Sequence, residues 1–388
     1  MEIKATYGQA AEAVVLGGTL NGLGVVRSLA RAGIPVTVVG TRFTGAALWS
    51  RHASPRLVRA YIGDNFTEDM IKLGKTFSKR PVLFLADEEC VRSVSENRNE
   101  LANWFIFRLP TSQCTDTASD KASFHEFALK HGFPVPRSIT LESGPDADRL
   151  EAMTFPCILK PDDKRQVLRG KAKRVVKAES LDEARTHALS MLSAGIRIVA
   201  QEWVEGADSN IYFTLFYRGR EGRKVAAFTG RKLLSFPRHV GSTAICVAAD
   251  EVRDVLEPMT LRFAECAGLD GMGSMEYKWD DIHKKFTMIE PTVGRTDWQE
   301  EIATLCGINI PAAAYRHELG LPPISEVVQG ANMTWRATVV DRVPRHLRTI
   351  GSVLIDGYFR WDDPLPALQH YCVVNPLRHL VRRWKTPK

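Results

Sequence analysis

Two strand-like segments joined by a short polar turn in the last third of the chain constrain the fold most. They are GSMEYKWD at 273–280 and FTMIEPTVGR at 286–295. Polar and apolar residues alternate in both segments, so side chains two positions apart share one face of a strand. The turn between them can fold the second strand back beside the first. We therefore expect a β-hairpin on which Glu276 and Glu290 converge.

Two carboxylates held this close repel each other unless one is protonated or a cation lies between them. Mg2+ bound by one or two carboxylates and by nucleotide phosphates is the usual arrangement in proteins. A hairpin with its charges on a solvated face is the alternative. Arg295, five residues after Glu290, favours a binding site.

The bulk composition is that of a globular protein with two or three domains. The chain has 388 residues, of which 44% are hydrophobic and 25% charged. No apolar run reaches the roughly eighteen residues that span a bilayer, and no signal peptide is recognisable. The seven cysteines are scattered without a C-x-x-C pair, which argues against zinc and a disulfide framework. We therefore expect a cytoplasmic protein.

Two basic segments account for more than the whole formal charge of +7. Residues 162–178 carry seven Lys and Arg against two Asp, and residues 376–388 carry five with no acid. A nucleic-acid-binding protein would instead show a basic stripe interleaved with aromatic residues, so we expect no nucleic-acid partner. The 376–388 tail predicts either a frayed terminal helix or weak peripheral contact with an anionic membrane.

Residues 13–40 have the strand, glycine loop, helix and strand pattern that opens a doubly wound α/β domain. The spacing of the glycines does not match a dinucleotide fingerprint, and no acid follows the second strand. Arg42 could still meet a 2'-phosphate, which leaves an NADP-dependent oxidoreductase as an alternative. Asp87, after the strand-like PVLFLA, either caps the next helix or contacts a ligand.

The remaining pattern predicts four units along the chain. An α/β domain covers 1–115, and a helix near 117–131 opens the next domain. Strands and a helix predict a first lobe at 116–195, and further strands with the hairpin predict a second lobe at 196–325. Residues 326–388 form a C-terminal extension with the basic tail. The two lobes should flank a cleft.

A set of polar landmarks follows a recognisable order. They are Lys121 in DKASFHEF, Lys160 in FPCILKP, Glu202 and Glu205 in QEWVEG, Arg231 and Lys232 in GRKL, Glu276, Glu290 and Arg295. With the closing run AGLDGMGSMEYKWD, IEPTVGR and ATLCGINIPAAAYRHELG, this order resembles the ATP-grasp superfamily over residues 12–320. The branch is that of carboxylate-amine ligases similar to D-aspartate ligase and the carbamoyl phosphate synthetase large chain. The resemblance implies α/β and α+β architecture, with an N-terminal Rossmann-like pre-ATP-grasp domain before a two-lobed ATP-grasp domain.

The resemblance also implies nucleotide-binding roles. Lys121 and Lys160 would reach the α- and β-phosphates of ATP. The hinge is Glu202, Trp203, Val204 and Glu205, in which main-chain groups of the middle two residues would read adenine and Glu205 would accept from the ribose hydroxyls.

Catalytic and metal-binding roles are implied in the same way. Arg231 and Lys232 would meet the γ-phosphate and the acyl phosphate, and Arg295 would steady charge on the transferring phosphoryl group and the tetrahedral intermediate. Glu276 and Glu290 would bind magnesium, with two Mg2+ ions expected and Mn2+ as a substitute.

Two departures from the family pattern stand out. Thr292 occupies the position where the family has Asn as a third magnesium ligand, and a hydroxyl is a weaker ligand. The 162–173 loop has Gly170 alone among lysines and arginines, so side-chain cations would replace the backbone amides that cradle phosphates. That composition predicts a mobile lid or a solvated loop. The departures leave a non-catalytic nucleotide-binding scaffold as a second alternative.

The predicted function is an ATP-dependent ligase. A substrate carboxylate would attack the γ-phosphate to give an acyl phosphate and ADP, and an amine would then displace phosphate to form an amide. The substrates are small-molecule carboxylates and amines, with an amino acid or small peptide expected by analogy. A homodimer is an expectation at the level of the family.

Overall fold

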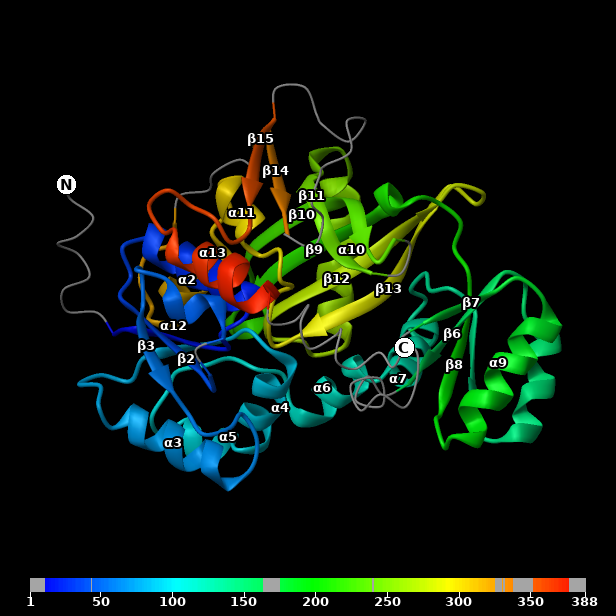
Figure 1. The fold of residues 1–388 in the computed structure, drawn as a ribbon, viewed down its shortest axis with the longest axis horizontal. Coiled ribbons are helices and arrows are strands. Elements are labelled where there is room, and N and C mark those ends of the chain that lie inside the picture. Colours follow the sequence, from blue (N-terminus) through cyan, green and yellow to red (C-terminus); the bar gives the residue numbers. More distant parts are fainter. Residues whose placement is uncertain are drawn as a thin grey trace.

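The computed structural model describes residues 11–42, 44–162, 175–238, 241–324, 330, 332–337 and 352–376. Most of the predicted lid loop and the basic tail after 376 lie outside this part of the chain. Within it the strands form three sheets, which lie one after another along the molecule (Figure 1). The predicted domain boundaries remain predictions.

The first sheet is parallel, with strand order β3-β2-β1-β4. Because the strands are parallel, the loops that follow β1 and β4 begin at the same edge of the sheet, and the strand order reverses between these two strands. The elements of this unit are β1 (Ala13–Leu16), α2 (Leu20–Arg31), β2 (Val36–Gly40), η1 (Ala46–Trp49), β3 (Ser54–Leu57), α3 (Asp64–Gly74), β4 (Val82–Leu85), α4 (Glu88–Glu96) and α5 (Arg98–Leu101).

The glycines of the first loop have a steric explanation. Gly17 has φ +123°, a conformation that residues with a side chain rarely adopt. A Cβ atom at Gly22 would overlap the carbonyl oxygen of Gly17. The glycine spacing therefore encodes a tight strand-to-helix turn in which α2 packs directly on the end of β1.

The second sheet belongs to a small lobe that stands apart at one end of Figure 1. Its strand order is β5-β8-β6-β7 and all pairs are antiparallel. Buried aliphatic side chains of α9 cover one face of the sheet. Two helices, α6 (Ser112–Ser119) and α7 (Lys121–Lys130), precede this sheet, and their buried side chains belong to the core of the third sheet. The elements of the lobe are β5 (Ser138–Leu141), η2 (Gly144–Ala152), β6 (Cys157–Pro161), β7 (Val176–Ala178), α9 (Leu181–Ser193) and β8 (Ile198–Glu202).

Two helices, α7 and α9, begin with a side-chain cap. The Asp120 side chain accepts from the backbone N–H of Ser123 at 2.8 Å at the start of α7. Ser180 accepts from the N–H of Glu183 at the start of α9. Each contact satisfies a donor that the first helical turn leaves without a partner.

The third sheet is the largest, with strand order β13-β12-β9-β10-β11-β14-β15. Its pairs are antiparallel except β14 with β15. Helix α10 covers one face, and α11 and α12 lie toward the N-terminal unit. The elements are η3 (Asp208–Asn210), β9 (Ile211–Arg218), η4 (Arg220–Gly222), β10 (Lys224–Phe236), β11 (Ser242–Ala248), η5 (Asp250–Val252), α10 (Arg253–Cys266), β12 (Gly271–Asp280), β13 (Lys285–Val293), α11 (Glu301–Leu305), α12 (Ile310–Glu318), β14 (Met333–Arg336), β15 (Val353–Asp356), α13 (Leu365–Leu368) and η7 (Gln369–Val374).

One hydrophobic core joins the large sheet to the N-terminal unit. Leu23 and Val26 of α2 belong to the same buried cluster as Phe213 and Phe228 of the large sheet. Burial of such a surface stabilises the contact by roughly 25 cal/mol per Å2 of apolar area. The two units are therefore held in a fixed relation, which matters for any site that draws residues from both.

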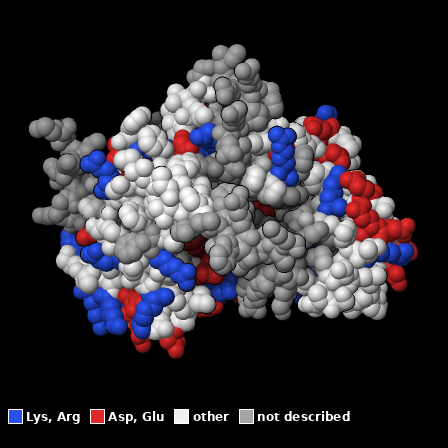
Figure 2. Space-filling model, viewed as in Figure 1, with Lys and Arg blue, Asp and Glu red and all other residues white. Residues whose placement is uncertain are grey.

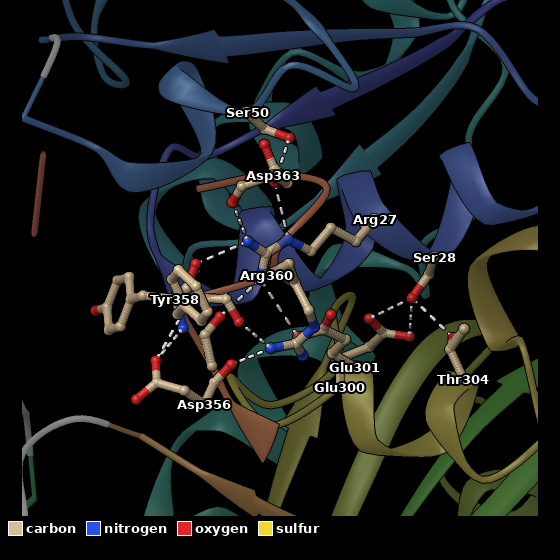
Figure 3. Close-up of polar contacts among 12 residues, drawn as sticks. Arg27, Ser28, Ser50, Glu300, Glu301, Thr304, Asp356, Tyr358, Arg360 and Asp363 are labelled. Carbon is tan, nitrogen blue, oxygen red and sulfur yellow. Dashed lines mark hydrogen bonds and ion pairs between the residues drawn. The ribbon is translucent and has the colours of Figure 1, made fainter. Parts of the chain in front are cut away.

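The C-terminal extension is fastened to this junction by a buried polar network (Figure 3). Arg27 of α2 donates to Asp363 at 3.0 Å and to the carbonyl oxygens of Gly357 and Tyr358. Arg360 forms an ion pair of 2.7 Å with Glu301 at the start of α11. Segments more than 300 residues apart in sequence are thus joined by paired charges.

Elsewhere on the surface, charges of both signs are mixed. Figure 2 shows Lys and Arg beside Asp and Glu at both ends of the molecule. Arg59 pairs with Asp69 at 2.8 Å and Arg185 with Glu151 at 2.6 Å. Exposed pairs of this kind contribute little to stability. In the described residues no helix combines the length and apolar character that crossing a membrane requires.

Candidate active site

The two carboxylates that the sequence singled out face each other across a strand pair. Glu276 of β12 and Glu290 of β13 are directly opposed in the antiparallel register, so their Cβ atoms are separated by roughly 5 Å. A register shift follows Glu276, and such irregularities re-aim side chains near functional sites. The predicted convergence of the two side chains is confirmed.

Lys232 of β10 reaches the same place from two strands away. Its ammonium forms an ion pair with Oε2 of Glu276, and the lysine is only 4% exposed. Burial raises the pKa of Glu276, the nearby Lys232 ammonium opposes that rise, and the charges of Asp297 and Glu290 add to it. The Lys232 ammonium thus offsets only part of the effect that burial and the neighbouring charges have on Glu276.

Asp297 is a third carboxylate at this site, and the sequence reasoning missed it. Its Oδ1 accepts from the hydroxyl of Thr292 at 2.9 Å, and its Oδ2 accepts from the hydroxyl of Ser274 at 2.8 Å. In the sequence, its position two residues after Arg295 could have suggested this role. Thr292, which departs from the family pattern, is therefore oriented by a carboxylate.

Arg295 lies in the loop that carries Asp297. Its Nη1 donates to the carbonyl of Thr296 at 3.1 Å and lies 4.0 Å from Oδ1 of Asp297. Asn21 of α2 donates to that same Thr296 carbonyl at 2.7 Å. The N-terminal unit thereby helps to fix the loop that presents the arginine.

The small lobe contributes the predicted phosphate-binding lysines. Lys160 on β6 is 9% exposed and donates to Oε1 of Gln201 on β8 at 2.8 Å. Lys121 begins α7, where its charge acts on Asp162 and opposes the rise in the pKa of that carboxyl caused by burial. The predicted loop, 162–173, begins at Asp162, and residues 163–174 lie outside the described chain.

The predicted hinge follows β8. Glu202 ends the strand and its side chain accepts from the N–H of Arg137 at 3.4 Å. The N–H of Trp203 donates to the carbonyl of Pro156 at 3.2 Å. Val204 is buried and Glu205 is exposed. The segment connects β8 of the small lobe to η3 and β9 of the large sheet, which is the position that a hinge between the lobes requires.

Comparison with known proteins identifies the architecture. No family model matches the chain. The chain is 20% identical to the D-aspartate ligase of Enterococcus faecium over 352 residues, which cover 86% of this chain and 83% of that protein. The structure is similar to the N5-carboxyaminoimidazole synthetase of Staphylococcus aureus complexed with ADP, with a TM-score of 0.63, 12% identity, and coverage of 81% and 78% of the two chains.

A second structural likeness comes from biotin carboxylase. The β-γ-ATP complex of the Campylobacter jejuni enzyme has a TM-score of 0.58 and 16% identity, with 81% of this chain and 72% of that one covered. The chain has the ATP-grasp fold. The resemblance to carboxylate-amine ligases of this fold, predicted from the sequence, is confirmed.

Within the ATP-grasp fold, Lys278 is a further residue that the sequence reasoning left without a role. It lies on β12, two residues after Glu276, and is 6% exposed. Its ammonium is 4.7 Å from the centre of the Trp203 ring, which Lys177 also approaches at 4.9 Å. Burial lowers the pKa of Lys278, and the charges of Asp208 and Glu205 oppose that shift.

Arg231 is not brought together with the other predicted catalytic residues. Its guanidinium donates to the carbonyl of Ser209 and lies 5.2 Å from the centre of the Tyr212 ring. The reason is the geometry of a strand, in which successive side chains point to opposite faces. Because Lys232 faces Glu276, its neighbour Arg231 points to the other face of the sheet.

The residues that could hold a metal ion are Glu276 and Glu290, with the Thr292 hydroxyl nearby. In the part of the chain described, no three His, Cys, Asp or Glu side chains form a metal site by themselves. Two carboxylates completed by phosphate oxygens match the coordination that Mg2+ favours. Burial and neighbouring carboxylates raise the pKa of Glu276, and a nearby cation would lower it again. The donor set therefore fits magnesium.

Proposed function

We propose that this protein is an ATP-dependent carboxylate-amine ligase that forms an amide through an acyl phosphate. The observation that carries this proposal is the opposed pair of Glu276 and Glu290 beside the buried Lys232. The likeness to D-aspartate ligase and to ADP- and ATP-bound neighbours of the same fold supports it.

ATP would be bound between the small lobe and the large sheet. Lys160 and Lys121 would neutralise its phosphates from the small lobe. Trp203 and Val204 would contact the base through main-chain groups, and Glu205 would accept from the ribose. Glu276 and Glu290 would hold Mg2+, which neutralises charge on the phosphates and orients them.

The chemistry needs no enzyme nucleophile. The substrate carboxylate attacks the γ-phosphorus, the bond to the β-phosphate oxygen breaks, and ADP leaves. The amine then attacks the acyl carbon, phosphate departs, and the amine gives up a proton. Lys232 and Arg295 provide fixed positive charge where negative charge develops, which lowers the barrier of both steps.

We further propose that the N-terminal α/β unit acts as the Rossmann-like pre-ATP-grasp domain and contributes to substrate selection. The shared core and the Asn21 contact to the Arg295 loop support this role. An amino acid is the proposed substrate class, because the relative that spans 86% of the chain is a D-aspartate ligase.

An ADP-release screen over carboxylate and amine pairs, with mass analysis of the products, tests the proposal. ADP should form only when a carboxylate is present, and the amide product should have the combined mass of the pair less one water. ATP binding with no turnover for any pair would instead indicate the scaffold alternative. NADPH binding that ATP does not displace would favour the oxidoreductase.

A further inference from the structure

The last helical segment of the described chain has polar residues on its inner face and apolar residues on its outer face. Helix α13 is followed directly by η7. Gln369 and His370 of η7 are buried, whereas Leu365 and Leu368 of α13 are 46% and 54% exposed. These two leucines are three residues apart and therefore share one side of the helix. A helix on the surface of a globular domain normally has the opposite arrangement, so the outer side of this helix is suited to apolar surroundings.

The inner side of the helix is polar because it is fastened to the rest of the molecule. Nε2 of Gln369 donates to the carbonyl of Thr44 at 3.0 Å. The ring of His370 stacks on that of Tyr358, with the ring centres 3.7 Å apart. The carbonyl of Tyr358 accepts in turn from Arg27 in the buried network. The helix therefore cannot turn about its axis to bury its leucines without breaking these contacts.

Further exposed apolar side chains lie before and after these leucines. Trp361, in the loop that leads into α13, is 90% exposed, and its ring meets that of Phe359 edge-on with the centres 5.0 Å apart. Val373 of η7 is exposed as well. Figure 2 shows mostly uncharged surface where α13 lies. We call Leu365, Leu368 and Val373, with the neighbouring Trp361, the outer face.

The chain that continues from η7 is positively charged. Residues 376–388 contain five Lys and Arg and no acid. Apolar residues recur among these charges in the sequence, namely Leu377, Leu380, Val381 and Trp384. Apolar side chains next to a basic segment complement an anionic membrane, because the former enter the boundary of headgroups and acyl chains and the latter attracts the headgroups. Tryptophan is enriched at this boundary, which agrees with the exposure of Trp361.

A second copy of the chain complements the outer face less well. A symmetric contact between two copies brings the same surface patch of each together. The 376–388 segments of both copies would then start from the same contact, and their like charges would repel each other. Anionic headgroups meet the same charges with attraction. The charge of this segment therefore favours a membrane over a second copy.

We propose that the outer face and the basic segment 376–388 bind the protein to an anionic membrane surface. The leucine, valine and tryptophan side chains enter the headgroup region, and the Lys and Arg side chains lie beside the headgroup phosphates. The buried Arg27 network and the contacts of Gln369 and His370 hold the outer face in a fixed position on the N-terminal unit. This inference goes beyond the proposed ligase function and does not depend on it.

Sedimentation of the full chain with lipid vesicles tests the inference. The vesicles are phosphatidylcholine alone and an equal mixture of phosphatidylcholine and phosphatidylglycerol. The wild type should sediment with the mixed vesicles but not with phosphatidylcholine alone, and high salt should release it because the charges are screened.

Two variants divide the binding between the outer face and the basic segment. Leu368→Glu should lower the partition coefficient for the mixed vesicles about 10-fold or more, because a charge replaces an apolar side chain that enters the membrane. The double variant Arg382→Gln/Arg383→Gln should lower it roughly 10- to 30-fold at low salt. The matched control is Ile282→Glu, which adds the same charge at an exposed apolar residue of the β12–β13 turn and should leave binding close to that of the wild type.

No sedimentation of the wild type with the mixed vesicles at low salt would overturn the inference, as would equal losses in Leu368→Glu and Ile282→Glu. Full binding by Leu368→Glu, with a loss only in the double arginine variant, would reject the role of the outer face. Ultracentrifugation without vesicles examines the second copy. A wild-type dimer that Leu368→Glu converts to a monomer would assign the outer face to a contact between copies and reject the membrane.

Discussion

Two clusters of charged side chains in this molecule differ in the balance between the opposite charges that they contain. Around Arg27, the buried or largely buried side chains of Arg27, Asp363, Arg360 and Glu301 meet opposite charges or carbonyl oxygens at 2.7–3.0 Å (Figure 3). The cluster around Glu276 contains three carboxylates, and their mutual repulsion contributes to the raised pKa of Glu276.

The difference separates a structural role from a binding role. A buried charge with complete pairing holds chain segments together, and removing one partner is costly. A carboxylate such as Glu276, whose pKa is raised by burial and by neighbouring carboxylates, is stabilised in its charged form when a cation arrives. The first cluster joins α2 to the C-terminal extension, whereas the second lies where the two proposed reaction steps need positive charge. Substitutions in the Arg27 network should therefore change mainly stability, whereas substitutions in the Glu276 cluster should change mainly turnover.

The largest expected effect is on turnover, from Glu290→Gln. Loss of a metal-binding carboxylate should lower kcat roughly 100- to 1000-fold, because the phosphates are no longer neutralised and aligned. The variant should remain folded, because Glu290 is only partly buried. ADP release and thermal unfolding measure the two quantities. Full activity in this variant would contradict the metal assignment.

The next effect is on stability, from Arg27→Met. This change leaves Asp363 buried without its guanidinium, which should lower the free energy of unfolding by about 3–5 kcal/mol. Denaturant unfolding measures it, and KM for ATP in the folded fraction should change little. The matched control is Arg59→Met, which breaks an exposed pair and should lower the free energy of unfolding far less. Equal losses in both variants would remove the distinction between the clusters.

The free energy of unfolding should depend on pH through Glu300, whose side chain is buried. Burial and the adjacent Glu301 raise the pKa of Glu300 from 4.5 to about 8, while Ser28 opposes the shift. The folded state therefore binds the proton more tightly than the unfolded state, so stability is greatest below pH 4.5 as far as this group is concerned and falls as pH rises toward 8.

The slope from this one group approaches about 1.4 kcal/mol per pH unit between those limits. Glu300→Gln, which resembles the protonated acid, should remove that part of the slope. Unfolding by denaturant at a series of pH values checks it. A slope that is identical in the variant would show that Glu300 is ionised in the fold.

The sequence predicted the hairpin and its carboxylate pair because both depend on local pattern. Alternation along the strands fixed the face of Glu276, and the short turn fixed its neighbour Glu290. The same alternation should have excluded pairing Arg231 with Lys232, since adjacent strand residues diverge. The family pattern places Arg231 and Lys232 together, whereas strand geometry separates them.

Other features depend on contacts that no local pattern carries. Asp297 reaches Ser274 across the strand pair, and Asp87 meets Thr19 over 68 positions in sequence. The helical N-cap rule suggested a local partner for Asp87, and tertiary structure supplied a distant one. The Arg27 network was likewise invisible, because Asp363 lies in an extension with no recognisable pattern.

The smallest effect is expected for Asp297→Asn. This variant tests whether Asp297 binds the metal ion itself or only orients a residue that does. Its oxygens accept from Thr292 and Ser274, so Asp297→Asn should preserve the fold while weakening the orientation of the Thr292 hydroxyl. Substitution of such a supporting group typically weakens metal binding about 10-fold or more. Titration of Mn2+ by electron paramagnetic resonance in the presence of ADP measures this directly. If Asp297→Asn instead matches the loss of turnover in Glu290→Gln, Asp297 acts as a ligand in its own right, and Thr292 is not the third oxygen donor.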